Sequence, residues 1–85
     1  MFVRPKDMLV SRVNDEMILL DPLQGEFLTF NPVAARAYEL LENPIEFEKL
    51  CAVLTDEFDV DLDVCRREMS DHLRDLVSRQ LVLIV

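Results

Sequence analysis

The strongest constraint on the fold of this chain is a change of hydrophobic period at Asn31-Pro32. Before this step, short apolar runs alternate with turn residues, as in β-strands. After it, apolar residues recur at every third or fourth position, as in helices. Asn is a favoured helix N-cap, and Pro fits the first helical turn because its missing amide hydrogen has no partner there. The sequence therefore predicts an α+β domain in which a small sheet precedes the helices.

Three antiparallel strands are predicted before this step. Residues 8–13 and 16–20 flank Asn14-Asp15, a pair that tolerates the positive φ of a two-residue hairpin turn. The third strand, Glu26–Phe30, follows a turn that ends in Gly25, the only glycine of the chain, which suits a left-handed backbone. The last strand of such a meander can lie at an edge of the sheet.

The turn before the third strand and the faces of that strand are also predicted. Asp21 can cap a turn in which Pro22 presets the backbone. Because side chains alternate along a strand, Leu28 and Phe30 share one face of the third strand, while its other face carries Phe27 and Thr29.

Three helices are predicted after the step, over residues 32–42, from 44 to about 57, and from 61 or 62 to 79. Each carries apolar side chains at three- and four-residue intervals, which is typical of a helix with one buried face. The final segment, residues 81–85, is an apolar tail that we expect to pack against the sheet or the helices. Three strands followed by three helices form a winged helix-turn-helix-like topology.

The composition limits the class of protein. The 85 residues predict a single domain, 1–85, and the formal net charge of −8 disfavours nucleic acid as a partner because phosphates require a basic surface. No apolar run reaches the ~20 residues of a membrane span, so no membrane association is expected. Cys51 and Cys65 lie in predicted helices, which favours a reducing cytoplasm, although a disulfide between them stays open.

The residues offer little catalytic chemistry. The only histidine, His72, lies seven residues after Cys65, or about 10 Å along a helix, which is too far for direct proton transfer. Cys65, Met69 and His72 share a face that resembles a soft-metal site, but a core-facing stripe is the favoured interpretation. The acidic stretch at 56–63 lacks the glycine and terminal glutamate of a calcium loop. We therefore expect a binding protein without metal or cofactor, and not an enzyme.

An ordered series of motifs resembles the PqqD-like family. It comprises Leu19-Leu20-Asp21-Pro22, then Gly25-Glu26-Phe27-Leu28-Thr29-Phe30-Asn31, and then the helix with Ala34, Tyr38 and Leu40-Leu41. The later apolar spacing, through Val64, Met69, Leu73, Leu76, Leu81 and Val82, is similar to the C-terminal pattern of the family. Three positions depart from it: Tyr38 replaces a common tryptophan, His72 a usual aromatic residue and Gln80 a frequent glycine.

The resemblance implies a domain that recognises the leader of a ribosomally made, modified peptide. Family members bind the leader as an added strand on the third strand, in a cleft shared with the third helix, so that backbone amides supply affinity and alternate pockets supply specificity. Carried over to this chain, the peptide-binding residues are Glu26, Phe27, Leu28, Thr29, Phe30, Val64, Glu68, Met69, His72, Asp75 and Leu76. Glu68 and His72 form an i, i+4 pair that we expect to meet a polar or basic leader side chain.

The sequence leaves several kinds of partner protein open. A stand-alone chain of this size resembles the leader-binding subunit of a lasso-peptide pathway, whose partner is a leader-processing cysteine protease. A member acting in quinone cofactor biosynthesis would instead serve as a peptide chaperone for a radical enzyme. A different class also stays open, an acidic adaptor or inhibitor whose carboxylates cover a basic protein surface.

Overall fold

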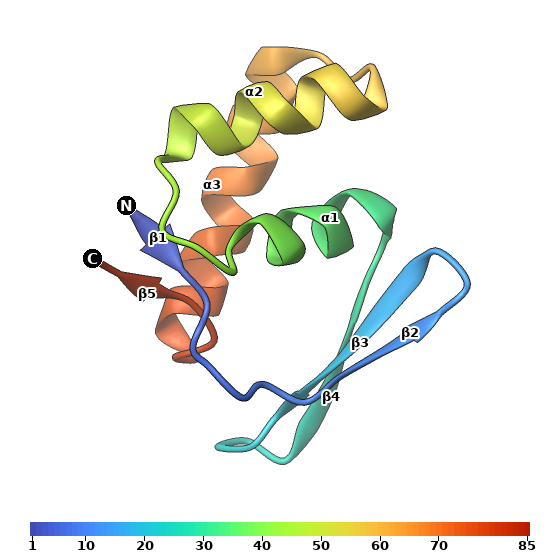
Figure 1. The fold of residues 1–85 in the computed structure, drawn as a ribbon, viewed down its shortest axis with the longest axis vertical. Helices are drawn as coiled ribbons and strands as arrows, with labels where there is room; N and C mark the ends of the chain where they lie inside the picture. The colour runs from blue at the N-terminus through green and yellow to red at the C-terminus, as the bar shows by residue number, and fades with distance from the viewer.

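A three-stranded sheet and three helices follow one another along the chain in the computed structural model, which describes residues 1–85 (Figure 1). The sheet has the order β2-β3-β4, with both pairings antiparallel. Two very short strands, one near each end of the chain, form a separate ribbon. The elements are β1 (Phe2–Val3), β2 (Val10–Val13), β3 (Glu16–Asp21), β4 (Glu26–Phe30), α1 (Pro32–Leu40), α2 (Phe47–Phe58), α3 (Leu62–Ser78) and β5 (Leu83–Ile84). This confirms the predicted α+β, winged helix-turn-helix-like class.

Both hairpins of the sheet use the turn residues that the sequence predicted. Asn14 has a φ of 58° in the turn between β2 and β3, and Gly25 has a φ of 69° just before β4. In the second turn, one carboxylate oxygen of Asp21, Oδ1, accepts backbone hydrogen bonds from Leu23 at 3.0 Å and Gln24 at 3.2 Å. An acceptor of this kind satisfies amides that have no strand partner.

Capping side chains set the starts of two helices. The side chain of Asn31 accepts a hydrogen bond from the amide of Ala34 at 2.9 Å, and Asp61 accepts one from Val64 at 3.1 Å. Asp59, with a φ of 52°, ends α2 in the left-handed conformation that commonly stops a helix. Only Asn31 separates β4 from α1, so the change of period in the sequence is also the boundary between sheet and helices.

The core lies between one face of the sheet and the three helices. Met17 and Leu19 of β3 and Phe30 of β4 contribute the sheet side, and the helices contribute small and branched side chains. The ring of Tyr38 lies edge-on to Phe30, with 5.7 Å between ring centroids, and its hydroxyl donates a buried hydrogen bond to the carbonyl of Leu81 at 3.0 Å. This bond joins α1 to the C-terminal segment, 43 residues away.

Several element boundaries differ from the prediction, and α1 ends at Leu40 and not at about residue 42. The first strand of the meander begins at Val10 and not at residue 8, since Asp7 has a φ of 63° and the chain turns there. The second helix begins at Phe47 and not at residue 44, because Ile45 exchanges backbone hydrogen bonds with Phe2 at 2.8 and 2.9 Å and is held in an extended conformation.

The C-terminal tail divides into two parts. Leu81 and Val82 are buried in the core, in line with the expected packing, whereas β5 pairs antiparallel with β1 and stays exposed. Figure 1 shows the two ends of the chain side by side at this ribbon. No helix of the structure has the length and apolar content needed to cross a membrane.

We expect Tyr38→Phe to lower the free energy of unfolding by about 1–3 kcal/mol, because the buried carbonyl of Leu81 loses its tyrosine donor. Urea denaturation followed by circular dichroism would measure the change. The matched control is Ser78→Ala, which removes an exposed hydroxyl that donates to the carbonyl of Asp75 at 2.7 Å and that water can replace. Equal losses for the two variants would contradict the importance assigned to the buried bond.

Candidate functional site

The strand β4 forms an open edge of the sheet. Its partner on one side is β3, and no strand lies on the other. The amide of Leu20 donates to the carbonyl of Leu9, toward β2, at 3.1 Å. In an antiparallel ladder the backbone groups of successive residues point to opposite edges. Leu20 is paired with Phe27, so the amide and carbonyl of Phe27, and of Thr29 two residues later, point to the open edge.

The helix α3 runs beside β4 in the opposite direction. Near the start of β4, the carboxylate of Glu26 accepts a hydrogen bond of 3.4 Å from the guanidinium of Arg79. Arg79 lies just after the end of α3. At the end of β4, the ring of Phe30 lies edge-on to His72, in the middle of α3, with 5.1 Å between ring centroids. Asn31, the residue after β4, lines a cavity together with Glu68. Glu68 lies one turn closer than His72 to the start of α3. The edge of β4 therefore lies beside α3, and we call the surface between them, from Arg79 to Asn31, the leader groove.

An apolar cavity of about 300 Å³ lies at the end of this groove where α1 and α3 begin. Most of its lining is hydrophobic, and two of these side chains, Val60 and Val64, are 37% and 36% exposed. The lining residues are Asn31, Val33, Ala34, Val60, Val64, Cys65, Glu68, Met69 and His72. Such a cavity can take an apolar side chain, with polar groups at hand to fix its orientation.

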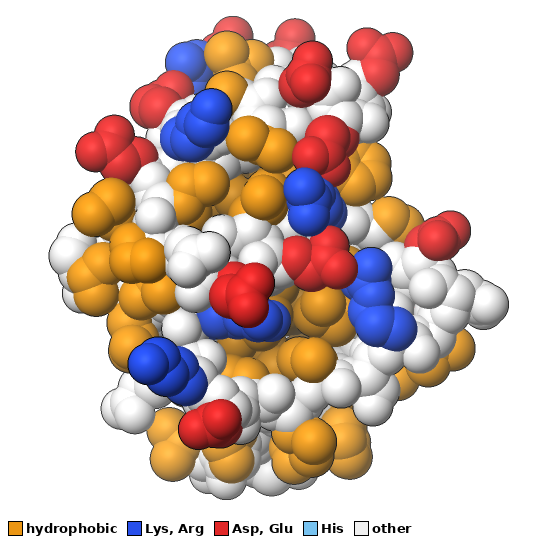
Figure 2. Space-filling model, viewed as in Figure 1, with side chains coloured by type: hydrophobic (Ala, Val, Ile, Leu, Met, Phe, Trp, Pro, Cys, Tyr) orange, Lys and Arg blue, Asp and Glu red, His pale blue; other side chains and the backbone are white.

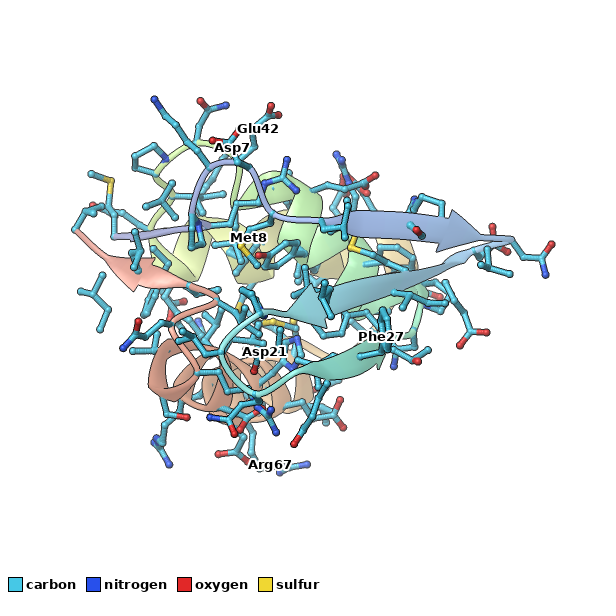
Figure 3. All side chains as sticks on the ribbon, turned by 90° about the horizontal axis from the view of Figure 1, so that it is seen from below. Asp7, Met8, Asp21, Phe27, Glu42 and Arg67 are labelled. Carbon is cyan, nitrogen blue, oxygen red and sulfur yellow. The ribbon has the colours of Figure 1, made fainter.

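An arginine cluster closes the other end of the groove. The guanidinium of Arg79 lies 3.1 Å from Asp75, 3.4 Å from Glu26 and 3.5 Å from Asp21. The pKa of Arg79 is raised mainly by its hydrogen bond to Asp75 and then by the negative charge of the same carboxylate. Asp21 is fully buried, and Figure 3 shows it between the hairpin and α3. The cluster fixes the β3–β4 hairpin against the end of the helix.

His72 lies at the boundary between the core and the cavity. Its Nε2 is buried and has no hydrogen-bond partner. Burial lowers the pKa of His72, and the nearby charge of Asp75 opposes this shift only in part. The imidazole is therefore neutral at neutral pH, and its Nε2 is a buried polar atom without a partner.

The structure brings most of the predicted site residues to this groove, in different roles. Val64, Glu68, Met69 and His72 line the cavity. On β4, Leu28 is half-buried and Phe30 is buried toward the core, whereas Phe27 and Thr29 are exposed on the outer face of the sheet, which confirms the predicted faces (Figure 3).

The remaining predicted residues do not line the cavity. Glu26 and Asp75 belong to the arginine cluster at its far end. Leu76 is 1% exposed and lies in the core beneath the groove, so its side chain offers no surface to a ligand.

Several residues of the cavity were not predicted from the sequence. Asn31, Val33 and Ala34 come from the first turn of α1, and Val60 from the loop before α3. The available signal was the direct passage from strand to helix at Asn31-Pro32, which brings the start of α1 next to the end of the edge strand.

The groove carries no evident catalytic or metal-binding arrangement. No three His, Cys, Asp or Glu side chains gather where they could hold a metal ion. Cys51 and Cys65 are both free and buried, and burial, aided by the neighbouring Cys65 thiol, raises the pKa of Cys51 to about 12. A thiol in this state is protonated and a poor nucleophile.

Two solved structures share this fold. One, described as TbiB1 in complex with the TbiA(beta) leader peptide, has a TM-score of 0.78 at 25% sequence identity over 94% of this chain and 93% of that one. The other, described as lasso peptide synthetase B1 complexed with the leader peptide, has a TM-score of 0.77 at 23% identity over 98% of each chain.

The sequence itself matches a family model but no curated protein. The model describes coenzyme PQQ synthesis protein D (PqqD) and matches residues 16–82. That span contains β3, the edge strand β4, all three helices and the groove between them. This chain therefore belongs to the PqqD family.

Proposed function

We propose that this chain binds the leader segment of a ribosomally synthesised precursor peptide by strand addition to β4. The observation that carries the proposal is the open edge of β4, where the backbone groups of Phe27 and Thr29 point outward beside an apolar cavity on α3. Backbone hydrogen bonds to an edge strand provide affinity for any extended peptide, and side-chain pockets select among peptides. Two structures of the same fold hold leader peptides, which supports this occupant.

An added strand presents its side chains alternately to the two faces of the sheet. Those that point toward α3 reach the cavity, where Val64 and Met69 offer apolar contacts. Those that point the other way lie next to Phe27, which is 71% exposed, and Thr29. The leader is therefore read by apolar residues at alternate positions, with Leu28, Phe30 and Leu76 supporting the groove from below.

Glu68 and His72 provide the polar part of recognition. They lie one turn apart on α3 and both line the cavity. The buried Nε2 of His72 has no partner in the free chain, and a polar group in that condition gains free energy from a ligand hydrogen bond. A polar or basic leader side chain, with its apolar stem in the cavity, satisfies both residues.

The bound leader is presented to a processing enzyme, and the chain itself performs no catalysis. We favour a leader-removing cysteine protease of a lasso-peptide pathway, since both similar structures come from leader-binding proteins and one is described as a lasso peptide synthetase B1. The alternative is a radical enzyme of quinone cofactor synthesis, which the description of the family supports. Two free, buried cysteines fit a cytoplasmic location.

Thr29→Pro is expected to abolish leader binding and to spare the fold. The amide of Thr29 points to the open edge, so proline removes a donor needed by the ligand and not one used by β3. We expect affinity for the cognate leader, measured by titration calorimetry, to fall more than about tenfold. Circular dichroism and thermal melting would check the fold.

The matched control is Arg12→Pro, on β2 at the opposite edge of the same sheet. The backbone amide of Arg12 also points away from β3, so proline removes no donor used within the sheet. This variant should bind the leader like the unmodified chain. Retained binding by a folded Thr29→Pro variant would move the site away from β4.

Glu68→Ala and His72→Ala are expected to weaken leader binding by about 1–3 kcal/mol each, because each removes a polar partner next to the cavity. Asp71→Ala is the control: Asp71 is an exposed carboxylate on α3 that does not line the cavity. Titration calorimetry at neutral pH would measure the three affinities. If the Glu68 and His72 variants bind like the control, the two residues only border the core.

The salt dependence of binding separates strand addition from the acidic-adaptor alternative. Backbone hydrogen bonds and apolar contacts are weakly screened, so leader affinity should change by less than about threefold between roughly 50 and 500 mM salt. An adaptor that uses its net charge of −8 to cover a basic surface should lose affinity steeply over this range. Fluorescence anisotropy of a labelled leader would record the titration, and a steep loss would favour the adaptor.

A further inference from the structure

A second groove lies on the other side of α3. It is an apolar cavity of about 350 Å³ between this helix, the start of α2 and the β1–β5 ribbon. Its hydrophobic lining consists of Phe2, Phe47, Leu73, Val77 and Ile84, and Arg74 is one of its two polar lining residues. None of these residues lines the leader groove.

The two grooves can be occupied at the same time. At 3.6 residues per turn, Glu68 and His72 project to one flank of the buried stripe of α3, and Arg74 and Val77 project to the other. The cavity beside β4 also lies toward the start of the helix, whereas the second groove lies toward its end. A ligand on β4 therefore leaves the second groove open to another molecule.

Two arginines on this exposed side of α3 lack strong partners. Arg67 is exposed and has no ion pair, and Arg74, 79% exposed, has only Asp71 at 3.8 Å. By contrast, Arg66 on the same helix lies 2.9 Å from Glu48 and 3.2 Å from Asp63. Arg67 and Arg74 are seven residues apart, which places them two turns, or about 10 Å, apart along one face. Figure 3 shows Arg67 on the side of α3 away from the sheet.

The apolar surface continues from the groove onto the ribbon at the chain ends. Leu83, Ile84 and Val85 are 43%, 67% and 61% exposed, and Figure 2 shows hydrophobic side chains gathered over β1 and β5. Arg74 lines this apolar groove, and Arg67 lies two turns earlier on the same side of the helix. Apolar side chains next to these two weakly paired cations are complementary to a surface that combines apolar and acidic side chains.

We propose that this second groove binds an acidic amphipathic helix of the enzyme that processes the leader. The helix lays an apolar stripe over Leu73 and Val77, and two of its carboxylates, seven residues apart, pair with Arg67 and Arg74. The inference rests on the proposed leader-binding function, since it assigns how the chain holds the enzyme while β4 holds the leader. One face of α3 then serves the peptide and another serves the enzyme.

The test is the double variant Arg67→Glu with Arg74→Glu. Leader affinity, by calorimetry, should stay within about twofold of the unmodified chain, because neither residue lines the leader groove. The rate of leader removal by the cognate protease, measured at limiting concentration of this chain, should fall at least about tenfold. Lysines in place of the paired carboxylates of the enzyme should restore that rate.

The control is Lys6→Glu with Lys49→Glu, which makes the same change of net charge at two other cations without ion pairs. It should leave the rate of leader removal unchanged. An equal fall for the control, or an unchanged rate for the arginine variant, would overturn the proposed docking surface. Dimerisation through this face, detected by light scattering and lost in the arginine variant, would overturn it as well. If the unmodified chain fails to bind the leader, the failure lies with the proposed function instead.

Discussion

Only Asn31 separates the edge strand β4 from α1, and the geometry of the site depends on this one-residue connection. Asn31 caps the helix through its side chain and also lines the cavity. Because no loop intervenes, the last residue of the strand, Phe30, is held against Tyr38 of α1 and His72 of α3. The end of an open edge is thereby fixed beside an apolar cavity, which is the combination that peptide recognition requires.

Ion pairs fix several elements of the chain to one another. Carboxylates on the helices hold Arg36, Arg66 and Arg79 in ion pairs. Arg79 fixes the hairpin to the helix, whereas exposed pairs such as Arg36–Glu57 contribute little to stability. The cavity keeps a neutral histidine with a buried nitrogen free. The arginine cluster and the unpaired nitrogen of His72 therefore lie toward opposite ends of the groove.

Local signals in the sequence were sufficient for the fold. The turn at Asn14, the capped turn at Asp21 and the positive φ at Gly25 all follow from residue types with known backbone preferences. The β1–β5 ribbon was not predicted, because strands of two residues carry no hydrophobic period and depend on contacts between the two ends of the chain. The start of α2 was misplaced for the same reason, since Ile45 is extended only through its pairing with Phe2.

The groove could be predicted only in part. Residue spacing along α3 identifies the core-facing stripe, but it does not say which members of that stripe also reach the cavity: Met69 lines it, whereas Leu76 does not. The contribution of α1 and Val60 to the cavity depends on how the helices pack. The resemblance to a family indicates the surface between β4 and α3, whereas the lining of the cavity is set by the packing of α1, α3 and the loop before α3.

The open edge of β4 has a cost when no peptide occupies it. Unpaired backbone groups next to an exposed Phe27 are a template for any extended chain, including the same strand of another copy, and such edge-to-edge pairing is a route to aggregation. Two copies that approach in this way bring together chains of net charge −8. Their mutual repulsion opposes the pairing, so the acidity of the chain protects the open strand against self-association.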